Sequence, residues 1–238
     1  MTEREILAYL ERDRVRRIDM IEAVRRGGAK ILYAEADAVL LLKLDLFCLL
    51  VSDTVEAGGR ALRTVPEGVR LFVAHNEASR DAVFAAYPEI NHASACWQAY
   101  YPGTEPIPVP DVCRIRPFPK EELPLLLSVY DPEGDPARYL ERIENGDVLA
   151  AYRDGEIAGF IGFHSDGSSG MLEVLPKFRR LGIGSALEIA LHNLALSRGW
   201  TPYGQIYTTN DASRKLQERL GMVVSDGAIY WMYEKKEN

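Results

Sequence analysis

The sequence predicts an α/β protein in which a mixed central sheet is flanked by helices. Short apolar runs of strand length alternate with segments of helical period along the chain. The clearest example is residues 171–195, where an apolar run ends at Pro176, a basic segment with Gly182 and Gly184 follows, and a helix begins near Ile183. The apolar positions of this helix recur at helical spacing: Ile183, Ala186, Leu187, Ala190, Leu191, Leu194 and Ala195.

The first half of the chain shows this alternation from its start. Thr2 and Glu5 have the spacing of a capping box and predict a helix that continues to about Arg25, before Gly27. Three apolar runs separated by acidic residues then predict adjoining strands, and punctuation by Pro and Gly sets off the later elements. We expect strands at 30–36, 38–44, 46–51, 69–74 and 93–101, and helices at 54–63 and 77–86.

A proline-rich stretch at 101–110 marks a domain boundary, because alternating prolines favour a stiff extended linker. We predict domains at 1–103 and 112–238, joined by a linker at 104–111. In the second half, Asp154-Gly155 is a strong hairpin turn signal. We expect strands at 112–116, 148–153, 156–163, 171–175 and 203–207, helices at 120–130 and 136–144, and a polar loop at 165–170.

The glycine turn that precedes Ile183 has the features of an anion site. The first backbone N–H groups of a helix lack intrahelical partners and lie at the positive end of its dipole. Gly182 and Gly184 let a phosphate approach the main chain, and Arg179 and Arg180 add positive charge. The simpler alternative is a tight turn with no ligand. The spacing is neither that of a P-loop nor that of a Rossmann unit.

The pattern Arg179-x-x-Gly182-x-Gly184 resembles the Arg/Gln-x-x-Gly-x-Gly/Ala signature of the GNAT superfamily of acyl-CoA-dependent N-acyltransferases. Asn210 and Ser213, followed by Leu220-Gly221-Met222, are similar to the ending of that family. Leu175-Pro176 and Tyr230-Trp231 resemble its glycine N-acyltransferase-like branch. The resemblance covers about residues 112–235 and implies a GNAT fold.

The resemblance also implies a co-substrate, acetyl-CoA or another acyl-CoA. In the family the loop amides bind the pyrophosphate of coenzyme A, and the preceding strand receives the pantetheine arm. The thioester oxygen is expected to bind the backbone N–H of Val174 or Leu175. The cofactor-binding residues expected on this basis are Val174, Leu175, Arg179, Arg180, Leu181, Gly182, Ile183, Gly184, Ser185, Asn210 and Ser213. For Asn210 and Ser213, helix capping is an equally good explanation.

N-acylation needs a base for the protonated amine, a donor for the oxyanion and an acid for the leaving thiolate. Glu173 interrupts the apolar strand beside the loop and is the first candidate base, unless it is only a solvated side chain. His164 is the second candidate. The branch also suggests a base near Asp166 or Ser168.

The family's usual leaving-group acid is a tyrosine seven residues after the asparagine, but that position here is Gln217. Tyr207, or Tyr230, is a candidate substitute, although aromatic residues on such strands are more often part of the core. The missing tyrosine keeps open the alternative of an acyl-CoA-binding pseudoenzyme or regulatory module.

The first half repeats a motif of the second. His75-Asn76-Glu77-Ala78-Ser79-Arg80 is similar to Thr209-Asn210-Asp211-Ala212-Ser213-Arg214, and both follow a strand and precede a helix. The order of predicted elements is also similar, which predicts two tandem GNAT-like domains. The first copy has Asp53 and Glu56 where the second has arginines, and acids repel a pyrophosphate. We therefore expect a degenerate N-terminal half that no longer binds coenzyme A.

Composition limits the remaining possibilities. A net charge of -7 argues against nucleic acid as a partner. Cys48, Cys96 and Cys113 show no metal-ligand spacing, so we expect buried thiols and no metal site. A charged N-terminus and the lack of a long apolar run predict a cytoplasmic protein with no membrane partner.

The expected acceptor is the primary amine of a small molecule or amino acid, attacked directly; a protein N-terminus or lysine is a weaker alternative. We expect a monomer with two pseudo-equivalent halves, or a homodimer. Arg138, Arg142 and Glu144 are predicted to form a solvated helix face.

Overall fold

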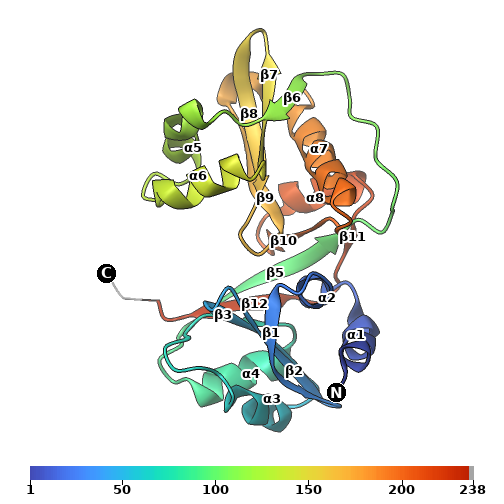
Figure 1. Ribbon diagram of the computed structural model, residues 1–238, viewed down its shortest axis with the longest axis vertical. Helices are drawn as coiled ribbons and strands as arrows, with labels where there is room; N and C mark the ends of the chain where they lie inside the picture. The colour runs from blue at the N-terminus through green and yellow to red at the C-terminus, as the bar shows by residue number, and fades with distance from the viewer. Residues whose placement is uncertain (236–238) are drawn as a thin grey trace. The chain divides into compact units, whose positions relative to one another are not determined.

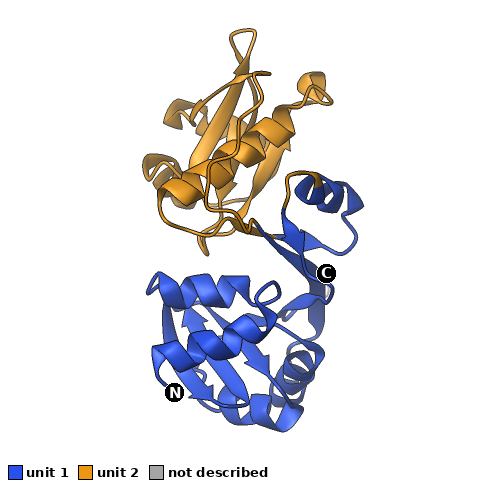
Figure 2. Ribbon diagram, turned by 90° about the vertical axis from the view of Figure 1, so that its right-hand side faces the viewer, with its two compact units in different colours: residues 1–100, 205–218, 222–238 blue, residues 101–204, 219–221 orange. Residues whose placement is uncertain are grey.

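The computed structural model describes residues 1–235, which form two compact units (Figure 2). Unit 1 contains residues 1–100 and 205–218 and the described residues from 222 onward, and unit 2 contains residues 101–204 and 219–221. The division near residue 101 lies close to the proline-rich stretch. However, residues 205–218 and the described residues from 222 onward belong to unit 1 with the first half of the chain. The compact units therefore have other boundaries than the predicted domains. The domains 1–103 and 112–238 stay a prediction about the chain's organisation.

Unit 1 is built on a sheet in the order β1-β2-β3-β4-β12-β5, with β11 also paired to β5. The C-terminal strand β12 is antiparallel to both β4 and β5 and lies between them. Its strands are β1 (Ala29–Glu35), β2 (Ala38–Lys43), β3 (Phe47–Ser52), β4 (Phe72–Ala74), β5 (His92–Tyr100), β11 (Val223–Val224) and β12 (Ile229–Tyr233). Its helices are α1 (Glu3–Leu10), α2 (Ile18–Arg25), α3 (Val55–Leu62), α4 (Glu77–Ala86) and α8 (Asp211–Arg219).

The two faces of this sheet bury separate cores. In β2 the side chains of Val39 and Leu41 join a core with α1 and α2, and those of Leu40 and Leu42 join a core with α3 and α4. This alternation is the two-residue period of a strand. Every residue of β2 and β3 is buried because both faces are covered, which explains their continuous apolar runs.

The capping box of Thr2 and Glu5 is confirmed. The single helix expected from there to about Arg25 is wrong, because a 3₁₀ turn at Glu11–Asp13 and a further turn separate α1 from α2. The break lets two short helices bury Ile6 and Ile21 in the same core.

Unit 2 contains the antiparallel order β9-β8-β7-β6, and β10 joins β9 in parallel at Gly204 and Ser169. Helix α7 covers one face, and α5 and α6 cover the other (Figure 1). The strands are β6 (Arg114–Pro117), β7 (Val148–Arg153), β8 (Glu156–Phe163), β9 (Ser169–Val174) and β10 (Tyr203–Tyr207), of which β10 continues into unit 1. The helices are α5 (Leu123–Tyr130), α6 (Pro136–Glu144) and α7 (Ile183–Ser197), with 3₁₀ turns at Lys120–Glu122 and Pro176–Phe178.

The proline-rich stretch is attached to unit 2. The side chain of Asn193 on α7 accepts a hydrogen bond from the N–H of Ile107 and donates one to its carbonyl, each at 2.8 Å. Between residues 1 and 235, no helix has the length and apolar character needed to cross a membrane.

Strand β9 contains a bulge at its centre. Gly170 pairs with Gly162, but Glu173 pairs with Phe160, so β9 has one residue more than β8 over this interval. Met171 adopts a left-handed φ of 57° within it. A bulge bends a strand and redirects its side chains, and bulges are frequent beside active sites.

Candidate functional site

The turn between β9 and α7 is open to solvent. Arg179, Arg180, Leu181 and Gly182 are all exposed, while Ile183 is buried and fixes the start of α7. Arg180 and Gly182 both have left-handed backbones, with φ of 64° and 80°. A left-handed residue within such a turn orients successive N–H groups toward one concave side, which is a common anion-binding arrangement.

The N-terminus of α7 has no side-chain cap. Gly182 occupies the N-cap position and has no side chain to accept a hydrogen bond from the first turn. By contrast, Thr2, Thr54, Asn76 and Asp135 each cap their helices with a side-chain oxygen. The first N–H groups of α7 are therefore available to an anion, with the helix dipole in favour.

The two glycines of the turn have different roles. Gly182 is required by its positive φ, although a Cβ there would meet only Val112, at 3.7 Å. A Cβ on Gly184 would make ordinary contacts with Val174 and Leu172, at 3.7 and 3.9 Å. The first turn of α7 thus lies against the end of β9.

The end of β9 presents Val174 on its open edge. The N–H of Leu175 donates to the carbonyl of Ala158 on β8 at 2.9 Å, so that amide is already used and Leu175 is excluded as the thioester donor. Hydrogen-bonded and non-bonded pairs alternate along an antiparallel ladder. Because Leu175 bonds to Ala158, the neighbouring pair of Val174 and Gly159 is non-bonded, and the N–H and carbonyl of Val174 point away from β8. Of the two expected donors, only Val174 has its N–H directed to the open edge.

Arg179 links the turn to this strand. Its Nε donates to the carbonyl of Val174 at 2.9 Å. The bond confirms that this carbonyl faces away from β8, and it places a guanidinium beside the N-terminus of α7. The two Nη groups of Arg179 remain for an anion in the turn.

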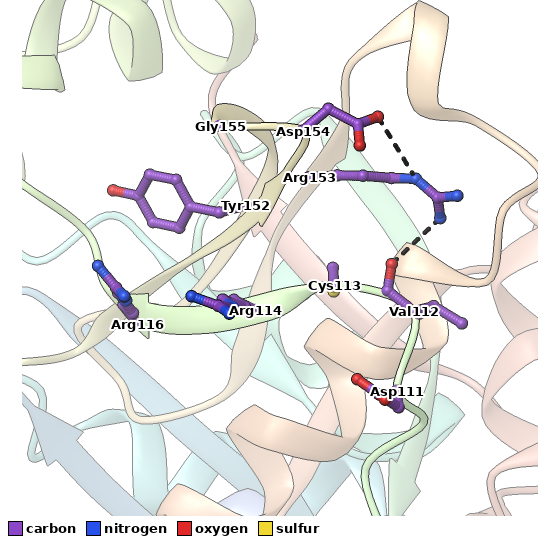
Figure 3. A pocket seen from close by; sticks show the side chains of 9 residues that line it. All are labelled: Asp111, Val112, Cys113, Arg114, Arg116, Tyr152, Arg153, Asp154 and Gly155. Atoms are coloured by element: carbon purple, nitrogen blue, oxygen red, sulfur yellow. Dashed lines mark hydrogen bonds and ion pairs between the residues drawn. The ribbon is translucent and has the colours of Figure 1, made fainter.

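A hollow of about 830 Å³ lies at the edge strand β6 and the β7–β8 turn (Figure 3). Three arginines line it, and one of them, Arg153, donates to the carbonyl of Val112 at 3.1 Å. Val112 also borders Gly182. The hollow therefore adds positive charge to the same end of unit 2 as the turn. Its lining residues are Asp111, Val112, Cys113, Arg114, Arg116, Tyr152, Arg153, Asp154 and Gly155.

Glu173 lies on the face of the sheet that carries α5 and α6. Its cross-strand partner Phe160 belongs to the core on that face, whereas its neighbours Leu172 and Val174 pack toward α7. Glu173 is half-buried, and within residues 1–235 its carboxylate makes no hydrogen bond or ion pair. Its carboxylate is therefore available to a ligand on the face opposite α7.

His164 lies at the end of β8, and its ring packs against the main chain of Gly170, where a Cβ would collide with it. Burial lowers the pKa of His164, an effect that the charge of Asp166 partly opposes. The imidazole is therefore neutral at pH 7, but its Nε2 faces Gly170. Asp166 accepts hydrogen bonds from the N–H and Oγ of Ser168 at 3.0 and 2.7 Å, which stabilises this turn.

Other predicted residues belong to unit 1. Tyr207 is 61% exposed at the end of β10. Asn210 caps α8 through a hydrogen bond from the N–H of Ser213 at 3.0 Å, so the capping role is confirmed for this pair. Gln217 is buried, and Tyr230 donates to Glu77 at 3.0 Å.

Comparison with known proteins agrees with this geometry. Residues 114–222 match the model of the acetyltransferase (GNAT) family. Over these residues the chain is similar to the GNAT family. The match spans the turn and the bulged strand β9, and members of the family use acetyl-CoA or another acyl-CoA as co-substrate.

Solved structures share the fold over nearly the whole chain. A Drosophila protein has a TM-score of 0.66 at 17% identity and covers 99% of this chain and 97% of its own. A GCN5-related N-acetyltransferase from Kribbella flavida has a TM-score of 0.60 at 14% identity, with coverage of 94% and 96%. A GNAT-family acetyltransferase from Colwellia psychrerythraea has a TM-score of 0.53 at 11% identity, with coverage of 85% and 84%. No curated protein matches the sequence.

Sequence reasoning missed two features of this candidate site. The bulge at Met171 has no residue signature, because a left-handed methionine is set by the surrounding ladder. Arg142 is buried, so the prediction that it is part of a solvated face is wrong. The helical spacing of Tyr139, Arg142 and Ile143 could have placed it on the buried side of α6.

Proposed function

We propose that this protein is an acyl-CoA-dependent N-acyltransferase that transfers an acetyl group, or another acyl group, to the primary amine of a small molecule or amino acid. The observation that carries the proposal is the uncapped, exposed N-terminus of α7 beside the open edge of β9 at Val174. A diphosphate on the turn would leave the pantetheine arm to run along that edge toward Glu173.

We assign the steps of direct attack to the following residues. The carboxylate of Glu173 accepts a proton from the acceptor's ammonium group, and the free amine attacks the thioester carbon. The N–H of Val174 stabilises the oxyanion of the tetrahedral adduct. The C–S bond then breaks, and the thiolate of coenzyme A leaves and takes up a proton. Tyr207 stays a predicted source of that proton, and His164 stays an alternative base.

The first half is proposed to be a degenerate GNAT-like domain without coenzyme A. The acids near Thr54 and the cap on α3 support this proposal. The relation to the glycine N-acyltransferase-like branch, and the contacts of Asn210 and Ser213 with the coenzyme A arm, also stay proposals.

The test measures acetyl-CoA binding by calorimetry and thiol release from acetyl-CoA across a panel of amines. Glu173→Gln should lower kcat by roughly 10²-fold or more, the usual range for loss of a general base, while the Kd for acetyl-CoA stays the same. Glu156→Gln is a matched control because Glu156 is exposed on β8. An unaltered kcat for Glu173→Gln would exclude it as the base.

The same experiment separates the alternative of a pseudoenzyme or regulatory module. Binding of acetyl-CoA without thiol release for any amine would favour that alternative. Absence of acyl-CoA binding would refute both.

A further inference from the structure

Arg142 is a buried cation beside the proposed catalytic strand. It lies on α6 in unit 2 and is only 7% exposed. Charged side chains are rarely buried to this extent unless they are paired. The surrounding contacts therefore show whether the protein itself supplies a partner.

Residues 1–235 supply no anionic partner for this guanidinium. Nη1 of Arg142 donates to the thioether sulfur of Met171 at 3.4 Å, and the guanidinium lies 5.5 Å from the ring centre of Tyr139. Sulfur is a weak acceptor. Over residues 1–235 no aspartate or glutamate forms an ion pair with Arg142, whereas Arg198 in the same unit pairs with Asp147 at 2.6 Å.

Part of the guanidinium stays accessible. Its Nε and Nη2 have no hydrogen-bond partner in the described residues. Neither atom is fully enclosed by protein, so both can be reached from solvent. These two nitrogens are the adjacent donors that bind a carboxylate in a bidentate manner.

The charges around Arg142 do not neutralise it. Arg138, one turn earlier on α6, repels it, while Asp166, Tyr130 and Tyr139 act in the opposite sense. Burial is the largest influence and lowers the pKa of Arg142, but a guanidinium stays charged at neutral pH. The nearby acidic side chains accept hydrogen bonds from donors other than Arg142. Asp131 accepts from the hydroxyl of Tyr139 at 2.7 Å, and Asp166 accepts from Ser168.

The position of this cation connects it to the reaction. Its sulfur partner Met171 is the bulged residue of β9, and Glu173 follows two residues later on the same strand. Met171 belongs to the core on the α5–α6 face, and so does Phe160, which pairs with Glu173 across the strands. A ligand held by Arg142 would thus lie on the face of the sheet where the proposed base is placed.

We propose that Arg142 binds a carboxylate of the acceptor, so that the substrate amine belongs to an amino acid. This inference rests on the proposed transferase function. The carboxylate would accept two charge-assisted hydrogen bonds from Nε and Nη2, while Nη1 keeps its contact with the Met171 sulfur, and it would orient the amine toward Glu173. Arg142 is then a residue that determines specificity by binding substrate.

A carboxylate could also come from the donor, as in succinyl-CoA. The experiment therefore compares acids with their neutral analogues on both sides of the reaction. Acceptors are glycine with glycinamide, L-alanine with L-alaninamide, and β-alanine with propylamine, all with acetyl-CoA. Donors are acetyl-CoA and succinyl-CoA, with propylamine as the acceptor.

The expected result is a kcat/KM at least about 30-fold higher for an amino acid than for its neutral analogue, equal to about 2 kcal/mol at 1.36 kcal/mol per tenfold. Arg142→Gln should remove this preference, and Arg142→Lys should restore part of it. Arg138→Gln is the matched control, because it removes the same charge from an exposed position of the same helix. It should change kcat/KM by no more than about threefold, as expected for a solvated charge.

A structural role predicts a different outcome. Because no acid within residues 1–235 pairs with Arg142, Arg142→Met should leave the Tm of the unliganded protein unchanged or higher. A large loss of Tm, together with equal losses for acids and amides, would show that Arg142 only supports the fold and would overturn the inference.

A binding measurement keeps the inference separate from turnover. N-acetylglycine and N-acetylglycinamide are titrated into the protein with coenzyme A present. Tighter binding of the acid, lost in Arg142→Gln, would support the inference even where no turnover is detected. Equal affinity for both, or a preference confined to succinyl-CoA, would overturn the assignment to the acceptor.

Discussion

Helices α3 and α7 each follow the last of three consecutive strands, β1–β3 or β7–β9, but the two helix N-termini differ in their caps and nearby charges. At α3, Thr54 caps the N–H of Ala57 at 3.2 Å, and the preceding Asp53 accepts from the hydroxyl of Tyr9 at 2.8 Å. At α7, Gly182 provides no cap, and Arg179 and Arg180 replace the acids. The protein therefore satisfies the first helix internally and leaves the second open to an anion.

The strands before these two helices also differ in how completely they are hydrogen-bonded to a neighbouring strand. Strand β3 pairs with β4 in parallel at three positions, and the N–H of His75 extends the ladder to Leu50. Strand β9 pairs with β10 only at Ser169. The comparison shows that the same strand–helix pattern occurs once with its cap and ladder complete, and once with the helix N-terminus uncapped and the strand edge mostly unpaired. It supports the proposal of a degenerate first half.

The largest expected effect comes from placing a negative charge in the turn before α7, like the acids that lie near the N-terminus of α3. Leu181 is 41% exposed, so Leu181→Glu should place a carboxylate among the free amides of the turn without disturbing the core. We expect the Kd for acetyl-CoA, measured by calorimetry, to rise roughly 100-fold because the carboxylate repels and displaces the diphosphate.

Leu181→Gln has nearly the same shape without the charge and is the control. It should change the Kd by no more than about threefold, and the difference between the two variants should shrink in high salt. An equal loss in both variants would mean that the turn contributes through its shape, or does not bind the diphosphate.

A smaller effect distinguishes the two glycines of this turn. Gly182→Ala should lower the free energy of unfolding by about 1–2 kcal/mol, because a φ of 80° is unfavourable for a residue with a Cβ. Gly184→Ala should leave it unchanged or slightly higher, since its Cβ would meet neighbours at ordinary distances. Urea unfolding measures both, and the reverse order would contradict the backbone assignment.

The smallest expected effect is a change in the pKa of Tyr9, which is hydrogen-bonded to Asp53 before α3. Burial raises the pKa of Tyr9, and the hydrogen bond to Asp53 raises it further. Asp53→Asn should therefore lower that pKa toward its ordinary value, so that Tyr9 ionises at a lower pH in an ultraviolet titration. The double variant with Tyr9→Phe should lack this change.

Asp53→Asn should also leave acyl-CoA binding unaltered, because Thr54 still caps α3. A gain of a second binding site would contradict the view that the cap closes this helix to ligands.

Local patterns predicted much of the fold. The helix at 136–144, the hairpin around Asp154-Gly155 and the strand at 203–207 are confirmed because their caps, turn residues and periods are all encoded nearby. The pairing of β12 with β4 and β5 was not predictable in this way, since it joins residues far apart in the sequence.

The candidate site was predicted to a similar extent. The exposed turn at Arg179–Gly182 follows from its own residues. The choice of Val174 over Leu175 depends on ladder register, which no short motif encodes. The burial of Arg142 could have been predicted only from its helical spacing with Tyr139 and Ile143.

The most direct test of the central claim compares the two helix N-termini in one amide-resolved NMR titration with coenzyme A. We predict large shifts for the N–H groups of Ile183, Gly184 and Ser185, with those of Val55 to Gly58 unchanged. Unchanged signals at α7, or equal shifts at α3, would contradict the claim that α7 alone provides the diphosphate site.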